Sequence, residues 1–213
     1  MTGGGSRSVG EVLERYGPGV RARYGRICAQ NGVAWPPRRV YLLAFKGDRR
    51  LEVWVAGARG PYILLDACPI LAASGGPGPK RREGDRQVPE GFYRLTSLNP
   101  NSAYHLSVRV DYPNREDAAH SRVPPSEMGG DIYVHGGSVS IGCLAIGDAA
   151  IERVFCLAAL AHPGQRRILI APRDFRRNPG NIPDPGEAWV RDLYARLRQA
   201  LRKFPVREPG AAT

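Results

Sequence analysis

The fold and the chemistry expected of this chain follow from one segment, Tyr133-Val134-His135-Gly136-Gly137-Ser138-Val139-Ser140-Ile141-Gly142-Cys143-Leu144-Ala145. Its β-branched and aromatic start predicts a strand that ends at His135. Gly136 and Gly137 then turn the chain, and a second short run brings Cys143 back beside the histidine. The segment therefore predicts an imidazole and a thiol that lie next to each other.

An imidazole beside a thiol suits nucleophilic catalysis by cysteine. The thiolate is the attacking species, and a neighbouring imidazole lowers the pKa of the thiol toward working pH. Gly142 leaves room for a substrate carbonyl near the backbone, and the N–H groups around Cys143 can face a developing oxyanion. The first hypothesis is acyl transfer through a thioester on Cys143.

Length and composition indicate one globular domain with appendages. The chain has 213 residues, of which 42% are hydrophobic and 24% charged, and its 26 glycines and 19 prolines favour a loop-rich, mostly β core. The net charge of +11 favours an anionic partner, such as nucleic acid, anionic lipid headgroups or an acidic cell-wall polymer. No apolar run is long enough to span a bilayer, and residues 1–6 lack the hydrophobic core of a signal peptide.

The four cysteines are Cys28, Cys68, Cys143 and Cys156, and none forms a CxxC pair. Without clustered ligands we expect no zinc site, and nothing else in the sequence indicates a metal or a cofactor. A catalytic Cys143 must stay free, so at most one disulfide can form. Cys156 is expected to be a small buried hydrophobe in a helix, and Cys28 and Cys68 are expected to be structural.

Hydrophobic periodicity divides the chain into three parts. Apolar spacing predicts two short helices before Trp35, with Pro18 starting the second. Strand patterns follow at 39–45, 51–55, 62–67, 91–95, 104–112 and 167–171, and a helix at 149–161 is expected to be capped by Asp148. Residues 74–89 form a long polar loop, and 186–204 an amphipathic helix. We therefore expect an N-terminal helical extension (1–38), a catalytic domain (39–173) and a C-terminal loop and helix (174–213).

The chain resembles the L,D-transpeptidase catalytic domain family (YkuD-like), in its YafK-like branch. Four groups of residues in the family's order carry the resemblance: Leu51-Glu52-Val53-Trp54-Val55; Gly78-Pro79-Lys80 with residues 84–93; residues 99–107 with Asp111-Tyr112-Pro113-Asn114; and His135-Gly136 with Ser140-Ile141-Gly142-Cys143. They span most of the chain between residues 39 and 171. The resemblance implies a mostly β (α+β) catalytic domain, like a β-sandwich or barrel with short flanking helices, and a cysteine in a groove.

The same resemblance implies an activity on peptidoglycan stem peptides. Cys143 would attack the carbonyl on the L-centre of the third stem residue, expel the terminal D-amino acid, and pass the acyl group to an amine. His135 would act as base and then as acid, a backbone carbonyl near Gly136 or Gly137 would orient its ring, and the amides of Gly142 and Cys143 would form the oxyanion hole. The implied location is the periplasm or cell envelope.

Hydrolysis by the same cysteine is the alternative. An L,D-carboxypeptidase or amidase would send the thioester to water, and an attached cell-wall protein is then a further candidate partner. Better-known family members carry a second histidine and an arginine where this chain has Ile141 and Ala145, so His135 alone would serve as acid and base. A papain-type protease is disfavoured because the cysteine follows its histidine in the chain. A nucleic-acid-binding module is also disfavoured, because we find no interleaved basic and aromatic residues or known motif.

Six residues are candidates for substrate binding: Ser140, Lys80, Arg86, Tyr104, His105 and Tyr112. Lys80 and Arg86 could clamp a peptide carboxylate or could simply keep a charged loop soluble. His105 could reach the groove or be a hydrogen-bonded structural residue. Tyr104 and Tyr112 could line the groove or pack as strand tyrosines.

Overall fold

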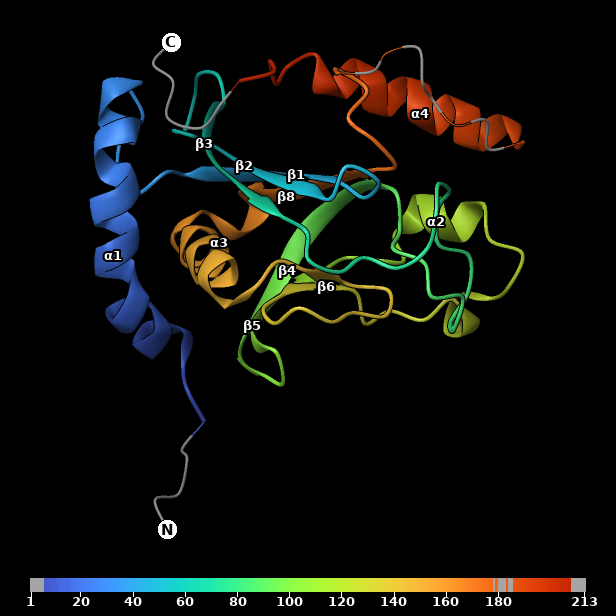
Figure 1. Ribbon diagram of the computed structural model, residues 1–213, viewed down its shortest axis with the longest axis horizontal. Helices are drawn as coiled ribbons and strands as arrows, with labels where there is room; N and C mark the ends of the chain where they lie inside the picture. Colours follow the sequence, from blue (N-terminus) through green and yellow to red (C-terminus); the bar gives the residue numbers. More distant parts are fainter. Residues whose placement is uncertain (1–5, 178, 180–182, 184–185, 208–213) are drawn as a thin grey trace.

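The computed structural model describes residues 6–177, 179, 183 and 186–207. Its centre is a curled sheet of eight strands in the order β3-β2-β1-β8-β4-β5-β6-β7 (Figure 1). The strands are β1 (Arg39–Phe45), β2 (Arg50–Ala56), β3 (Ile63–Pro69), β4 (Gly91–Ser102), β5 (His105–Val110), β6 (Tyr133–His135), β7 (Leu144–Ala145) and β8 (Arg166–Ala171). Only the β1–β8 and β6–β7 pairs are parallel. This mixed α+β architecture has the expected fold class.

Helices cover both faces of this sheet. Helices α1 (Val9–Gln30) and α3 (Asp148–Leu160) lie on one side and α4 (Ala188–Leu201) on the other, with α2 (Arg115–Ala119) beside the start of β4 (Figure 1). Short 3-10 turns, η1 (Pro125–Glu127) and η2 (Pro163–Gln165), complete the described elements.

The sheet has two hydrophobic cores because successive strand residues point to opposite faces. On β1, Leu42 packs with the α1 and α3 side, whereas Leu43 packs beneath α4. On β8, Ile168 and Leu169 divide in the same way. Both faces are therefore dry, which explains why β1 and β8 are nearly continuous apolar runs.

The strand predictions match the structure closely, apart from β4. This strand continues to Ser102 instead of stopping at Leu95, and its second half pairs with β5 through irregular register. Residues 96–102 are Thr-Ser-Leu-Asn-Pro-Asn-Ser, which lack the alternation that marks a half-buried strand.

The prediction of two N-terminal helices was wrong, because α1 is one helix of 22 residues with Pro18 inside it. Val12 and Val20 are buried on either side of the proline, so packing holds both halves on the same core. Ser8 and Glu11 form a capping box at the start of α1. The helix packs mainly against α3. Whether residues 1–38, 39–173 and 174–213 act as separate parts stays a prediction.

The predicted cap of α3 was wrong by one residue. Gly147, with a φ of +80°, is the N-cap, and Asp148 is the first helical residue. All four cysteines are free thiols, and Cys28, Cys68 and Cys156 are buried as expected. No described helix is both long enough and apolar enough to cross a membrane.

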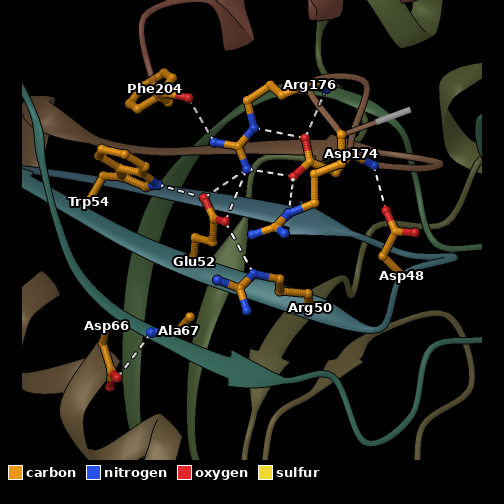
Figure 2. A network of polar contacts seen from close by, with 10 residues as sticks. Asp48, Arg50, Glu52, Trp54, Asp66, Ala67, Asp174, Arg176 and Phe204 are labelled. Atoms are coloured by element: carbon orange, nitrogen blue, oxygen red, sulfur yellow. Dashed lines mark hydrogen bonds and ion pairs between the residues drawn. The ribbon is translucent and has the colours of Figure 1, made fainter. Parts of the chain in front are cut away.

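A buried ionic network fastens the segment before α4 to β2 (Figure 2). The Arg176 guanidinium pairs with Glu52 at 3.0 Å and with Asp174 at 2.7 Å, and it also donates to the carbonyl of Phe204 at 2.8 Å. The Trp54 indole donates to Glu52 at 2.9 Å. The network therefore joins the two ends of the α4 region to the sheet.

Candidate active site

The pairing of β6 with β7 positions the predicted cysteine and histidine. In this parallel pair His135 lies opposite Ala145 and Val134 opposite Leu144, so Cys143 comes level with Tyr133. Cys143 lies directly before β7, and its sulfur turns to the backbone of Tyr133 and Asp131. The register therefore brings Cys143 beside β6, two residues from the level of His135.

The Cys143 thiol is half-buried and is held by the backbone of the segment before β6. Its sulfur accepts from the N–H of Tyr133 at 3.4 Å and donates to the carbonyl of Asp131 at 3.3 Å. No hydrogen bond joins it to His135 among the described residues. Burial raises the pKa of Cys143 and the Asp131 charge raises it further, while the Tyr133 N–H and the Lys80 charge lower it. The expectation that the imidazole lowers this pKa was therefore wrong for this structure.

The His135 ring is buried and anchored by its neighbour. Its Nδ1 lies 2.6 Å from the carbonyl oxygen of Gly136, which can only accept, so Nδ1 carries the proton and Nε2 keeps its lone pair. Burial lowers the pKa of His135, and the bond to Gly136 offsets part of that shift. The Tyr104 ring lies beside it, with ring centroids 4.5 Å apart. His135 is thus a neutral imidazole with a nitrogen able to accept a proton.

The glycine turn after His135 fixes the orienting carbonyl. A Cβ on Gly136 would lie 2.5 Å from the Tyr104 carbonyl oxygen and 2.6 Å from Asp148 Oδ1, so only glycine fits. Gly137 adopts a φ of +67°, and its N–H donates to Asp148 Oδ1 at 2.8 Å. Asp148, predicted as a helix cap, therefore tethers the β6 turn to the start of α3.

The two amides predicted to form the oxyanion hole already have partners. Gly142 N–H donates to Ser74 Oγ at 2.7 Å, and Cys143 N–H donates to Ser140 Oγ at 2.9 Å. Ser140 thus lies within the predicted site. Ser74 was not among the predicted site residues: it is the first residue of the polar loop 74–89, 68 residues before Gly142 in the chain.

The two basic candidates differ in their surroundings. Lys80 is buried, pairs with Asp85 at 2.6 Å and donates to the carbonyl of Arg82 at 2.7 Å, so it holds the 80–87 loop together while its charge reaches Cys143. The Asp85 carboxylate also accepts from backbone N–H groups of this loop. Arg86 is exposed at a φ of 53° and contacts no polar partner among the described residues.

The remaining aromatic candidates also separate. Tyr104 lies against His135, but His105 turns its ring to Glu152 of α3, with Nε2 2.9 Å from the carboxylate. Tyr112 is buried, packs on the ring of Tyr93 and lies 5.9 Å from Lys80 Nζ. The contacts of His105 are those of a hydrogen-bonded structural residue, and the contacts of Tyr112 are those of a packed strand tyrosine. Both roles were alternatives in the sequence analysis.

Exposed apolar side chains gather around this site. Among the described residues, five large hydrophobic side chains are exposed, and four of them lie on segments that flank β6 and β7: Leu71, Tyr104, Val139 and Ile141. The backbone N–H of Leu71 donates to the carbonyl of Ala145, which holds its segment beside β7. Ile141, directly before Gly142, is 77% exposed. The segments next to β6 and β7 therefore carry apolar surface that is free to contact a ligand.

Comparison with known proteins identifies the family. No family model matches the chain. It is 34% identical over 169 residues to "Putative L,D-transpeptidase YafK" of Escherichia coli K12, an alignment that covers 78% of this chain and 66% of that protein. The protein of the same name from strain O157:H7 gives the same values.

The chain belongs to the L,D-transpeptidase family, in its YafK-like branch. It spans just under two thirds of the length of these curated relatives. The fold is also similar to that of the helical cell shape determining protein Pgp2 from Campylobacter jejuni, at 21% identity and a TM-score of 0.51 over 73% of this chain and 56% of that one. The K307A mutant of Pgp2 gives the same TM-score over 55% of its chain.

Proposed function

We propose that this protein is a peptidoglycan L,D-transpeptidase that works through a thioester on Cys143. One observation carries the proposal: the parallel β6–β7 pair brings Cys143 beside the strand that ends at His135, in a chain 34% identical to "Putative L,D-transpeptidase YafK". The proposed substrate is a stem peptide of the cell wall, and the proposed location is the cell envelope. The net charge of +11 suits attraction to an anionic wall polymer.

In the first step the thiol attacks the carbonyl carbon on the L-centre of the third stem residue. Because both side chains are neutral at rest, the thiol proton passes to Nε2 of His135 as the carbon–sulfur bond forms. The amide bond to the terminal D-amino acid then breaks, and His135 returns the proton to the leaving amine. Asp148 and Gly136 act as positioning residues, since they hold the ring that accepts the proton.

The oxyanion that develops in this step needs hydrogen-bond donors. The Gly142 and Cys143 amides are the proposed donors, and the hydroxyls of Ser74 and Ser140 occupy them in the free protein. We infer that the substrate oxygen replaces at least the Ser74 hydroxyl, since Ser74 belongs to a separate segment of the chain. Each hydroxyl keeps one amide hydrogen-bonded until substrate binds.

In the second step an acceptor amine attacks the thioester, His135 removes the amine proton, and Cys143 is released as thiol. Water in place of the amine would make the protein an L,D-carboxypeptidase or amidase with the same residues. The exposed apolar side chains of Val139 and Ile141 support the transferase, because apolar surface beside the thiol lowers the access of water once a peptide covers it. Release of an attached cell-wall protein would be hydrolysis of the same kind.

The test is incubation with a purified disaccharide tetrapeptide, with and without an added amine such as glycine. We expect loss of the terminal D-amino acid, a protein mass increased by the acyl group, and an amine-exchanged product. Cys143→Ala should abolish all three, and His135→Asn should leave a folded protein without acylation. A trimmed tripeptide as the only product, with amine present, would establish hydrolysis instead. Unchanged turnover in Cys143→Ala would overturn the whole proposal.

A further inference from the structure

Away from the candidate active site, a hollow of about 550 Å³ lies on the sheet face that also carries α4. Its floor is a row of three side chains across neighbouring strands, because Tyr41 of β1 and Arg94 of β4 both pair in register with Arg167 of β8. Phe92, two residues before Arg94, lines the same hollow and packs against the core under α4. The hollow thus continues the α4 face of the sheet beyond its apolar part.

The acidic residues of this hollow are already neutralised. Asp111 pairs with Arg94 at 2.7 Å, and Glu116 pairs with Arg196 of α4. The hollow has three guanidinium groups in its lining, from Arg94, Arg115 and Arg167. The two carboxylates therefore leave an excess of positive charge facing the space.

Two of these guanidinium groups make no hydrogen bond or ion pair with any residue that the structure describes. Arg115 is exposed at the rim and makes no hydrogen bond or ion pair with a described residue. Arg167 is half-buried, and its Nη1 atom is buried with no hydrogen-bond partner. Nη1 itself is enclosed by protein, so a ligand in the hollow reaches the rest of the Arg167 guanidinium, which makes no hydrogen bond or ion pair with a described residue. A half-buried charged donor is rarely left without an acceptor, so this group beside an open hollow points to a ligand that accepts from it.

The chemistry of the lining selects the ligand. A guanidinium group donates two parallel hydrogen bonds to the oxygens of a phosphate, and a phosphate has enough oxygens for more than one arginine. The rings of Tyr41 and Phe92 add an apolar wall on which the carrier of the phosphate can pack.

We propose that this hollow is a binding site for a phosphate group, held by Arg167 and Arg115, on a soluble phosphate ester or a lipid headgroup. Arg94 contributes positive charge and stays paired with Asp111. The site uses neither Cys143 nor His135, so a test of phosphate binding is independent of a test of the proposed transpeptidation.

Calorimetric titration of the full chain with inorganic phosphate and with glucose 1-phosphate tests the site. We expect saturable binding that Arg115→Gln and Arg167→Gln each weaken about tenfold, the usual scale for losing one charge-assisted contact. Arg122→Gln is the matched control, because Arg122 is highly exposed and lines a different arginine-rich hollow with Arg81 and Arg82. It removes the same charge and should change the affinity less than twofold.

Thermal unfolding of each variant shows whether it is folded. Because Arg115 is exposed, Arg115→Gln should not affect folding, and this variant decides the outcome if Arg167→Gln unfolds. Equal weakening by Arg115→Gln and Arg122→Gln would reduce the effect to net charge and overturn the proposal, as would the absence of saturable binding. Flotation with phosphatidylglycerol or phosphatidylcholine vesicles separates the sources. Arg115-dependent binding to the anionic vesicles indicates a lipid headgroup, and binding of glucose 1-phosphate alone indicates a soluble ester.

Discussion

At Cys143 and His135, burial favours the uncharged form of each side chain, raising one pKa and lowering the other. The pair is therefore stored as thiol and neutral imidazole, not as a thiolate–imidazolium ion pair. In the proposed mechanism, nucleophile and base become charged only when the proton moves, and the substrate must bring them together. This places the activation of the sulfur within the reaction step itself.

The resting state has a consequence for alkylation of the free protein. Because the pKa of Cys143 lies above its ordinary value of 9.0, its rate of reaction with iodoacetamide should still be rising above pH 9. The other three thiols are buried, with the pKa of Cys28 and Cys156 raised to about 11, so they react more slowly. A plateau at or below pH 8 would show that the resting pair is charged. Cys143→Ala supplies the background rate.

Turnover should follow a different pH profile from alkylation. His135 must be unprotonated to accept the thiol proton, and its pKa is lowered from 6.5, so activity should fall only below pH 6.5. His135→Asn should remove turnover while leaving the alkylation profile of the free protein nearly unchanged, since no hydrogen bond joins the ring to the sulfur. An equal shift of both profiles in His135→Asn would contradict this assignment.

In the proposed mechanism the Ser74 hydroxyl, which accepts from the Gly142 amide, competes with the substrate oxygen for that amide. Ser74→Ala should therefore speed thioester formation, by up to about tenfold, because one hydrogen bond is worth about 0.5–1.5 kcal/mol. Single-turnover mass spectrometry of the acylated protein measures this rate. Ser121→Ala, which removes a serine hydroxyl bound only to Val123, serves as the control. A slower Ser74→Ala protein would mean that the hydroxyl assists the oxyanion instead.

At the scale of elements, the turn between β6 and α3 carries the site. Two strands of three and two residues would not hold a catalytic pair by themselves, but Asp148 fastens the turn and the N–H of Ile146 donates to the carbonyl of His135. The candidate site therefore lies where β6, β7 and α3 meet, and the packed core beneath α3 keeps its residues in place.

The two glycines of this turn should differ in their sensitivity. Gly136→Ala places a methyl group 2.5 Å from a backbone oxygen and should lower the free energy of unfolding by roughly 3 kcal/mol. Gly137→Ala meets only ordinary contacts, so its cost is that of a left-handed backbone, about 1 kcal/mol. Urea denaturation measures both values. Equal costs would mean that the packing around Gly136 relaxes freely.

Sequence patterns identified most elements because strands and helices bury alternating or helical faces. They failed where packing overrides local preference. Pro18 suggested a break, yet buried residues on both sides keep α1 continuous. The second half of β4 lacked alternation and becomes a strand only by pairing with β5. Neither outcome follows from local residue preferences, because each depends on contacts with distant segments.

At the scale of the whole molecule, three buried ionic groups join elements that are distant in sequence. Asp66 of β3 binds Tyr24 of α1 and Arg153 of α3, with the arginine at 2.9 Å. Glu52 of β2 binds Arg176 before α4 (Figure 2). The third joins Lys46 to Glu90 at 2.9 Å, and Glu90 also accepts from the Tyr194 hydroxyl of α4 at 2.7 Å. Each connects a covering segment to the sheet, so the layers should unfold together.

The Glu52–Arg176 pair should be costly to break. Glu52→Gln removes the negative charge from a site where the carboxylate is 1% exposed and the guanidinium 9%. The loss should lower the free energy of unfolding by about 3 kcal/mol, because the Glu52 carboxylate neutralises Arg176 and Arg50 and accepts from Trp54, and a neutral amide cannot replace these buried contacts. Arg94→Gln, which breaks a pair with a 66% exposed arginine, should cost under about 1 kcal/mol. Urea denaturation of both variants gives the comparison, and similar costs would contradict the role of burial.

The candidate site shows the same limit on what sequence can predict. The sequence between His135 and Cys143 predicted the turn that follows β6. The glycines of this turn showed where the backbone must lie close to neighbouring atoms. The hydrogen bond from Gly142 to Ser74 could not be predicted, because it joins segments whose approach depends on the full sheet order. The direction of the Cys143 pKa was also missed, since burial depends on the assembled fold.

The buried pairs also determine how the protein would react with an amine-selective label. The chain has only three lysines, Lys46, Lys80 and Lys203, and the first two have their ammonium groups enclosed in ion pairs. Among the lysines, a succinimidyl ester should therefore modify the exposed Lys203 of the folded protein and leave the other two unlabelled. Labelling at Lys46 and Lys80 would then report the opening of the 76–88 connection, which Lys46 holds through the carbonyls of Gly76, Gly78 and Val88.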